Sequence, residues 1–171
     1  MAKQKASMSL DEFGRIVKKV VLSLPERIRR YLDNVIVDVE EAPNEEVLRA
    51  VGLTEQEIAR GETIYGLFEP MFPGAWSDAL DFHTMPHRIV IYKQPLERDF
   101  PDRRQLCIEI RKTVIHELAH HFGWTDRDLE SFDEHPDPFE DDWLGWGKGE
   151  KMAPSADVHA KRANTSESNG D

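Results

Sequence analysis

The stretch VIHELAHHFGWTDRDLE, from Val114 to Glu130, places two histidines and a glutamate within five residues, then a glycine and an aspartate. His116 and His120 are four residues apart, so on a helix they lie one above the other on the same face. Two imidazoles in that position can bind one metal ion, as H-E-x-x-H sequences do for zinc. Glu117 projects beside the pair, where a carboxylate can take a proton from water without being a ligand. The alternative is a polar helix face whose side chains are solvated.

A catalytic zinc also needs a third protein ligand and an open position for water. Gly123 can adopt the left-handed conformation that ends a helix and turns the chain back. Asp126, six residues after His120, can then bring a carboxylate to the same ion. Alternatively, Asp126 serves only to start the next helix, where acidic residues are favoured. The H-E-x-x-H pattern alone would arise by chance in roughly 3% of such chains, but adding this glycine and aspartate reduces that to about one in several thousand.

The rest of the chain predicts an α+β fold around this helix. Helical spacing of apolar residues indicates helices at 9–24, 25–34 and, as the longest, 102–123, with shorter segments at 44–52, 53–61 and 126–132. Stretches rich in β-branched or aromatic residues indicate strands at 35–43, 63–69 and 88–94. Residues 70–86 contain too many turn formers for a regular element.

Composition restricts the class of protein. A chain of 171 residues that are 39% hydrophobic can supply one ordinary core. The sequence contains no run of about 18 apolar residues and no apolar segment after its basic start, so we expect neither a membrane-spanning helix nor a signal peptide. The single cysteine, Cys107, excludes an internal disulfide and favours a reducing, cytoplasmic location. The net charge of −11 argues against nucleic-acid and membrane partners.

Three segments follow from the pattern along the chain. Residues 1–8 are expected to be a flexible arm, 9–135 the folded domain, and 136–171 a disordered acidic tail. The sequence leaves open what Trp143 and Trp146 do within that tail, and it indicates no oligomeric state.

The residues HELAHHFGWTD fit the pattern H-E-x-x-H-x-x-G-x-x-D, a variant of the metzincin arrangement with aspartate in place of the third histidine. With RIVIYKQPLERDF at 88–100, the chain resembles the minimal zincin family of bacterial metallopeptidases over about Ser9 to Phe132. The resemblance implies a compact fold in which a short mixed sheet packs on the H-E-x-x-H helix, so that 9–135 is a zincin-like metallopeptidase domain. It also implies the metal ligands and the general base: Zn²⁺ held by His116, His120 and Asp126, with Glu117 as the base. The Met-turn that underlies the zinc in metzincins has no counterpart here, because Met152 lies in the polar tail.

Three functions are compatible with these residues. The first is a zinc-dependent peptidase acting on a peptide or protein substrate, and the second is a zincin-fold metal-binding scaffold or regulatory module without proteolysis. The third takes His135 as the third ligand, at a spacing similar to that of SprT-type proteases acting on DNA-bound proteins, which the acidic balance disfavours. His121 faces elsewhere on the helix.

For a peptidase, residues 88–92 are the candidate for the strand nearest the cleft, where an extended substrate would pair. The alternative is a core strand. His83 and His87 flank the preceding loop, and one of them could donate a hydrogen bond to a developing oxyanion. The alternative for both is a surface loop role.

Overall fold

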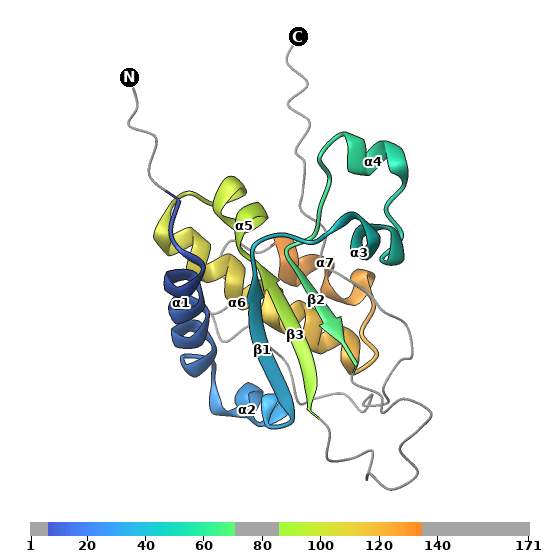
Figure 1. The fold of residues 1–171 in the computed structure, drawn as a ribbon. Helices are drawn as coiled ribbons and strands as arrows, with labels where there is room; N and C mark the ends of the chain where they lie inside the picture. Colours follow the sequence, from blue (N-terminus) through green and yellow to red (C-terminus); the bar gives the residue numbers. More distant parts are fainter. Residues whose placement is uncertain (1–6, 71–85, 135–171) are drawn as a thin grey trace, which may run out of the picture.

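The computed structural model describes residues 7–70 and 86–134, and its elements surround one long helix (Figure 1). In chain order they are α1 (Leu10–Leu22), α2 (Glu26–Arg29), the 3-10 helix η1 (Arg30–Leu32), β1 (Val35–Glu40), α3 (Glu45–Ala50), α4 (Glu55–Ala59), β2 (Gly66–Glu69), β3 (His87–Tyr92), α5 (Lys93–Asp99), α6 (Arg103–His121) and α7 (Asp126–Glu134). The α+β class predicted from the sequence is confirmed.

The three strands form one mixed sheet in the order β1-β3-β2. β1 runs parallel to β3, with Val37 opposite Ile89, whereas β2 runs antiparallel to it, with Phe68 opposite the same residue. The prediction that 88–92 could be the strand on which a substrate pairs is therefore wrong, since β3 is paired on both sides. Within the described residues, β1 and β2 are the two edge strands, each with β3 on one side only.

The alternation of strand side chains divides the core between the two faces of the sheet. Ile89 and Ile91 belong to the larger cluster, which includes residues of α1 and α6. Val90 and Tyr92 belong to a smaller cluster that includes Leu48 of α3. α6 thus lies against the sheet with α1 beside it, and α7 packs on α6 (Figure 1).

Nearly every residue of α6 from Ile108 to His120 is buried, including polar ones. This helix is covered by the sheet, by α1 and by α7, so it has no solvent face along its second half. The alternative of a solvated polar face for His116 and His120 is therefore excluded. Because buried polar groups are costly without partners, each of them must be bonded.

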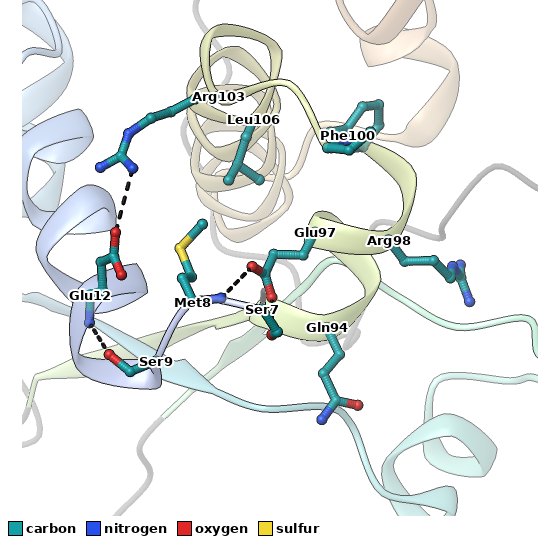
Figure 2. A pocket seen from close by; sticks show the side chains of 11 residues that line it. Ser7, Met8, Ser9, Glu12, Gln94, Glu97, Arg98, Phe100, Arg103 and Leu106 are labelled. Carbon is teal, nitrogen blue, oxygen red and sulfur yellow. Dashed lines mark hydrogen bonds and ion pairs between the residues drawn. The ribbon is translucent and has the colours of Figure 1, made fainter. Parts of the chain in front are cut away.

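The helix α5 differs from the sequence-based expectation, and the N-terminal segment makes contacts that the sequence did not indicate. α5 was not predicted, because the strand expected at 88–94 included Lys93 and Gln94 and residues 95–99 were assigned to no element. Pro95 is tolerated in this helix, because in the first turn its missing N–H has no partner to lose. At the N-terminus, Ser7 Oγ and Met8 N donate hydrogen bonds to the carboxylate of Glu97 at 2.9 and 3.0 Å (Figure 2).

A groove of about 580 Å³ lies between this N-terminal segment, α5 and the start of α6 (Figure 2). Its lining includes Met8, Phe100 and Leu106 together with Glu12 and Arg103, and it contains none of the candidate metal ligands. None of the helices in residues 7–70 and 86–134 is long and apolar enough to cross a membrane.

Candidate metal centre

The turn after α6 has a defined conformation that begins with Gly123. This glycine has a φ of +84°, as a helix terminator in the left-handed region should. Its N–H donates to the carbonyl of His120 at 2.9 Å, and the N–H of Trp124 donates to that of Ala119 at 3.1 Å, which together make a Schellman motif. The turn brings the Trp124 carbonyl to 2.8 Å from Nδ1 of His120. The helix terminator therefore supplies a partner for a candidate ligand.

The next residues start α7 and turn the chain back over α6. Thr125 caps the new helix: its hydroxyl accepts from Asp128 N at 3.3 Å, and its own N–H donates to Asp128 Oδ2 at 2.8 Å. This reciprocal pair is a capping box with aspartate in the third position. Asp126, the first residue of α7, reaches back so that its Oδ1 lies 3.1 Å from His120 Nε2 and 3.6 Å from His116 Nε2.

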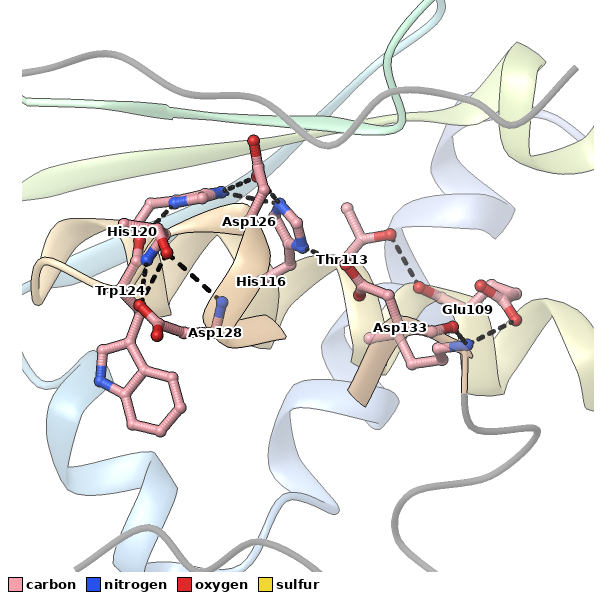
Figure 3. A network of polar contacts seen from close by, with 10 residues as sticks. Glu109, Thr113, His116, His120, Trp124, Asp126, Asp128 and Asp133 are labelled. Carbon is pink, nitrogen blue, oxygen red and sulfur yellow. Dashed lines mark hydrogen bonds and ion pairs between the residues drawn. The ribbon is translucent and has the colours of Figure 1, made fainter. Parts of the chain in front are cut away.

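The structure thus brings together three of the four predicted site residues (Figure 3). One ligand atom from each of His116, His120 and Asp126 lies within 4.8 Å of the other two, and these residues form the one such group of three in the described part of the chain. The two Nε2 atoms are 2.8 Å apart.

The hydrogen bonds on the far side of each ring fix where its proton is. His116 Nδ1 lies 2.8 Å from Asp133 Oδ2, and His120 Nδ1 lies 2.8 Å from the Trp124 carbonyl. A carboxylate and a carbonyl can only accept, so both Nδ1 atoms must carry hydrogen. In the neutral imidazoles both Nε2 lone pairs then point at each other and at Asp126 Oδ1. Three acceptors that converge in this way repel unless a proton or a cation lies between them, and this donor set suits a divalent metal.

The geometry fits zinc with a small adjustment. Two nitrogen ligands of a tetrahedral zinc stand roughly 3.3 Å apart, since each Zn–N bond is about 2.0–2.1 Å. The two Nε2 atoms at 2.8 Å need to separate by roughly half an ångström, which side-chain rotation can provide. The histidine side chains are 4% and 2% exposed, whereas that of Asp126 is 75% exposed. The site therefore opens to solvent on the side of Asp126, where a further ligand can enter.

Glu117 lies on the adjoining face of α6, turned towards β2. The residue is fully buried, and its Oε2 accepts a hydrogen bond from the N–H of Phe68 at 3.2 Å. This contact needs a close approach of strand and helix, and Gly66 permits it. A Cβ built on Gly66 would lie 2.6 Å from Thr113 Cγ2 and 3.4 Å from Glu117 Cγ. Sequence reasoning gave Glu117 no partner and gave Gly66 no role.

Phe68 also anchors a pair of histidines at the end of α6. Its ring stacks on His121 at 4.4 Å between centroids, and the ring of His87 lies 4.7 Å from that of His121. Burial lowers the pKa of His87, and burial followed by proximity to His87 lowers that of His121. Both effects favour the neutral form of the ring. His121 does face away from the metal ligands, as expected, and the oxyanion role of His87 stays a prediction.

Several predicted residues lie outside the described residues, namely His83, His135, Trp143, Trp146 and Met152. Conversely, the sequence analysis missed Asp133, which contacts a candidate ligand directly. A signal was available: Asp133 is seven residues after Asp126, so on a helix both carboxylates share one face.

A family model described as zincin-like metallopeptidase matches residues 32–135. The match covers all three strands, the H-E-x-x-H helix and α7, but it begins after α1. No curated protein matches the chain. The resemblance inferred from HELAHHFGWTD is thereby confirmed, and the family implies a metal, typically zinc.

Proposed function

Because the chain belongs to the zincin-like metallopeptidase family, we propose that it is a zinc-dependent peptidase. In this proposal His116, His120 and Asp126 hold the zinc, and Glu117 is the general base. The observation that carries the proposal is the convergence of His116 Nε2, His120 Nε2 and Asp126 Oδ1, while the Nδ1 atom of each ring lies 2.8 Å from an acceptor oxygen. Such a set has no function in a solvated helix face, but it matches what a cation requires.

A zinc ion bound there would polarise the scissile carbonyl and acidify a water molecule for attack. The chain's own contribution to the chemistry is proton transfer and positioning. Glu117 takes the proton of the attacking water and later passes it to the leaving amine. The hydrogen bond from Phe68 holds this carboxylate in one orientation, so both transfers use the same group in the same place.

The same hydrogen bond indicates which strand would hold the substrate. Residues of an antiparallel strand point their main-chain groups alternately to the two sides. Tyr65 accepts from Tyr92 on the β3 side, whereas the Phe68 N–H points to Glu117 on the other side. Gly66 shares the direction of Phe68, so the outer main-chain groups of β2 lie beside the general base. An extended peptide pairing with β2 would pass close to the carboxylate that acts on it.

A metal-binding scaffold without proteolysis is the second candidate, and one observation favours it. Glu117 has no solvent exposure, and its carboxylate is bonded to the chain itself. A base must contact the water that it deprotonates, so this conformation must admit water for the peptidase to work. The scaffold needs no such access.

The experiment that separates the two begins with metal content. Protein purified without chelators should carry or take up about one zinc per chain. Glu117→Gln keeps the size of the side chain but cannot accept the proton, so zinc occupancy should stay near normal. Hydrolysis of any peptide that the wild type cleaves should fall by at least about a hundredfold.

Glu130→Gln is the matched control, because Glu130 is an exposed glutamate on α7 outside the site, and it should leave both quantities unchanged. Well-folded protein that takes up no zinc at neutral pH would refute the site. A wild type that is fully metallated but inert against a broad peptide library would establish the scaffold instead.

A further inference from the structure

α7 presents two carboxylates and one apolar side chain on a single face. Asp126, Leu129 and Asp133 stand at positions i, i+3 and i+7, which fall on one side of a helix. Leu129 is 1% exposed and belongs to the larger core cluster. The packing of this leucine fixes α7 against α6. Asp126 then reaches the Nε2 side of His116, and Asp133 reaches the Nδ1 side of the same ring (Figure 3).

A buried lysine holds the C-terminal end of α7 in place. Lys112 is 4% exposed, and its ammonium donates a hydrogen bond to the main-chain carbonyl of Asp133. The last four carbonyls of a helix lack partners within it. A cation at this end also interacts favourably with the negative end of the helix dipole. Lys112 Nζ lies 3.5 Å from Glu109 Oε1, which accepts from Gln105 Nε2 at 2.9 Å. The backbone of Asp133 is therefore tied to α6 independently of its side chain.

The backbone contact with Lys112 consequently keeps the carboxylate of Asp133 beside His116. Its side chain is 26% exposed, whereas that of its partner His116 is 4% exposed, so the hydrogen bond of 2.8 Å is partly shielded from water. A carboxylate on Nδ1 fixes the ring orientation and makes Nε2 a stronger donor to a metal. His120 has only a neutral carbonyl in the same position. The two histidines are therefore not equivalent.

We propose that Asp133 is a positioning residue of the metal site, which holds His116 with its Nε2 lone pair turned to the ion while Lys112 fixes Asp133 on α6. This inference rests on the proposed function as far as the metal ligands are concerned, and it does not depend on proteolysis. Asp126 and Asp133 together also supply two negative charges, which balance the charge of a divalent ion.

Zinc affinity measured by competition with a chromophoric chelator tests the proposal. Asp133→Ala should weaken zinc binding by about 10- to 100-fold, the usual effect of removing such a partner. Asp133→Asn keeps an oxygen that accepts from Nδ1 but loses the charge, so its affinity should fall between those of the wild type and the alanine variant. Glu130→Gln removes the same charge from an exposed position on α7 and should bind zinc as the wild type does.

Two spectroscopic readouts separate positioning from a merely structural effect. In the cobalt-substituted protein, the visible absorption bands should shift in Asp133→Ala and be largely restored in Asp133→Asn. In the metal-free wild type, nitrogen NMR should find the proton of His116 on Nδ1, a measurement that needs no variant to fold.

The outcomes are distinguishable. Wild-type zinc affinity in a folded Asp133→Ala protein, or a His116 Nδ1 without a proton, would overturn the role of Asp133 while leaving the metal site intact. A wild type that takes up neither zinc nor cobalt would overturn the metal site, and the inference with it.

Discussion

Gly66→Ala is the substitution that most directly tests how β2 positions Glu117. The added Cβ would lie 2.6 Å from Thr113 Cγ2 and 3.0 Å from the Val90 carbonyl oxygen. Carbon atoms pack at about 3.5–4.0 Å, so β2 and α6 must move apart by roughly 1 Å at this point. The Phe68–Glu117 hydrogen bond, now 3.2 Å, would then lengthen to roughly 4 Å, where no hydrogen bond forms.

The expected cost can be estimated from two opposing effects. Overpacking a tight core typically costs about 1–3 kcal/mol, whereas replacing a glycine inside a strand gains about 0.5–1 kcal/mol of backbone entropy. The free energy of unfolding should therefore fall by roughly 1–2 kcal/mol. Because Glu117 loses the hydrogen bond from Phe68 that orients it, peptide hydrolysis should fall as well, with zinc occupancy unchanged.

Thr113→Ser provides a matched test of the cause. Serine lacks the Cγ2 methyl group but keeps the hydroxyl that donates to the Glu109 carbonyl at 2.7 Å. Alone it should cost roughly 1 kcal/mol for the lost methyl group. Combined with Gly66→Ala it should recover part of the loss, giving a coupling energy of about 1 kcal/mol in urea denaturation. Gly66→Ala with wild-type stability, or a strictly additive double variant, would refute the steric argument.

Three further predictions concern other parts of the chain. Asp126→Ala should weaken zinc binding at least about tenfold, whereas His135→Ala should change it little, as measured by chelator competition; the reverse order would assign the third ligand to His135. Gly14→Ala should raise the free energy of unfolding by about 0.5–1 kcal/mol, because its added Cβ meets Val39 Cγ2 at an ordinary 3.4 Å and alanine favours the helix. Burial raises the pKa of Glu97, but the Met8 amide, the Ser7 hydroxyl and Lys93 outweigh burial and leave that pKa below 4.5. The ionised Glu97 side chain therefore stabilises the fold above pH 4.5, and this contribution is lost on acidification. Glu97→Gln should flatten the pH dependence of the free energy of unfolding in that acidic range.

Most elements of the fold follow from local patterns, and the exceptions have physical reasons. Apolar spacing indicated α1, which faces the core with one side, and α6, whose apolar residues recur at helical spacing although nearly all of it from Ile108 to His120 is buried. α5 was missed because its seven residues begin directly after β3, and the strand expected at 88–94 extended over its first two residues, Lys93 and Gln94. The position of β3 in the centre of the sheet could not be predicted either. Strand order depends on long-range pairing, and a buried run such as RIVIY is compatible with the centre and with an edge.

In the metal centre, too, the features set by local sequence could be predicted and those set by long-range packing could not. His116, His120 and Asp126 could be predicted, because helix periodicity and one glycine bring them together. The contacts of Asp133 and of the Phe68 N–H could not be predicted from the motif alone, since they depend on how α7 and β2 dock on α6. Helix spacing places Asp133 on the same face as Asp126, but it does not show that this face docks on His116.

The local origin of the proposed ligand set explains how so small a domain would hold a metal. Helix spacing aligns the two imidazoles, Gly123 directs the Trp124 carbonyl to His120, and the Thr125 cap starts the helix whose first residue is Asp126. All of these relations are set within thirteen consecutive residues, from His116 to Asp128. Tertiary structure then has two tasks, to dock α7 through Leu129 and to bring β2 close enough to hold Glu117. A three-stranded sheet and a few helices are enough for both tasks, so the site does not require the larger scaffold of a bigger protease.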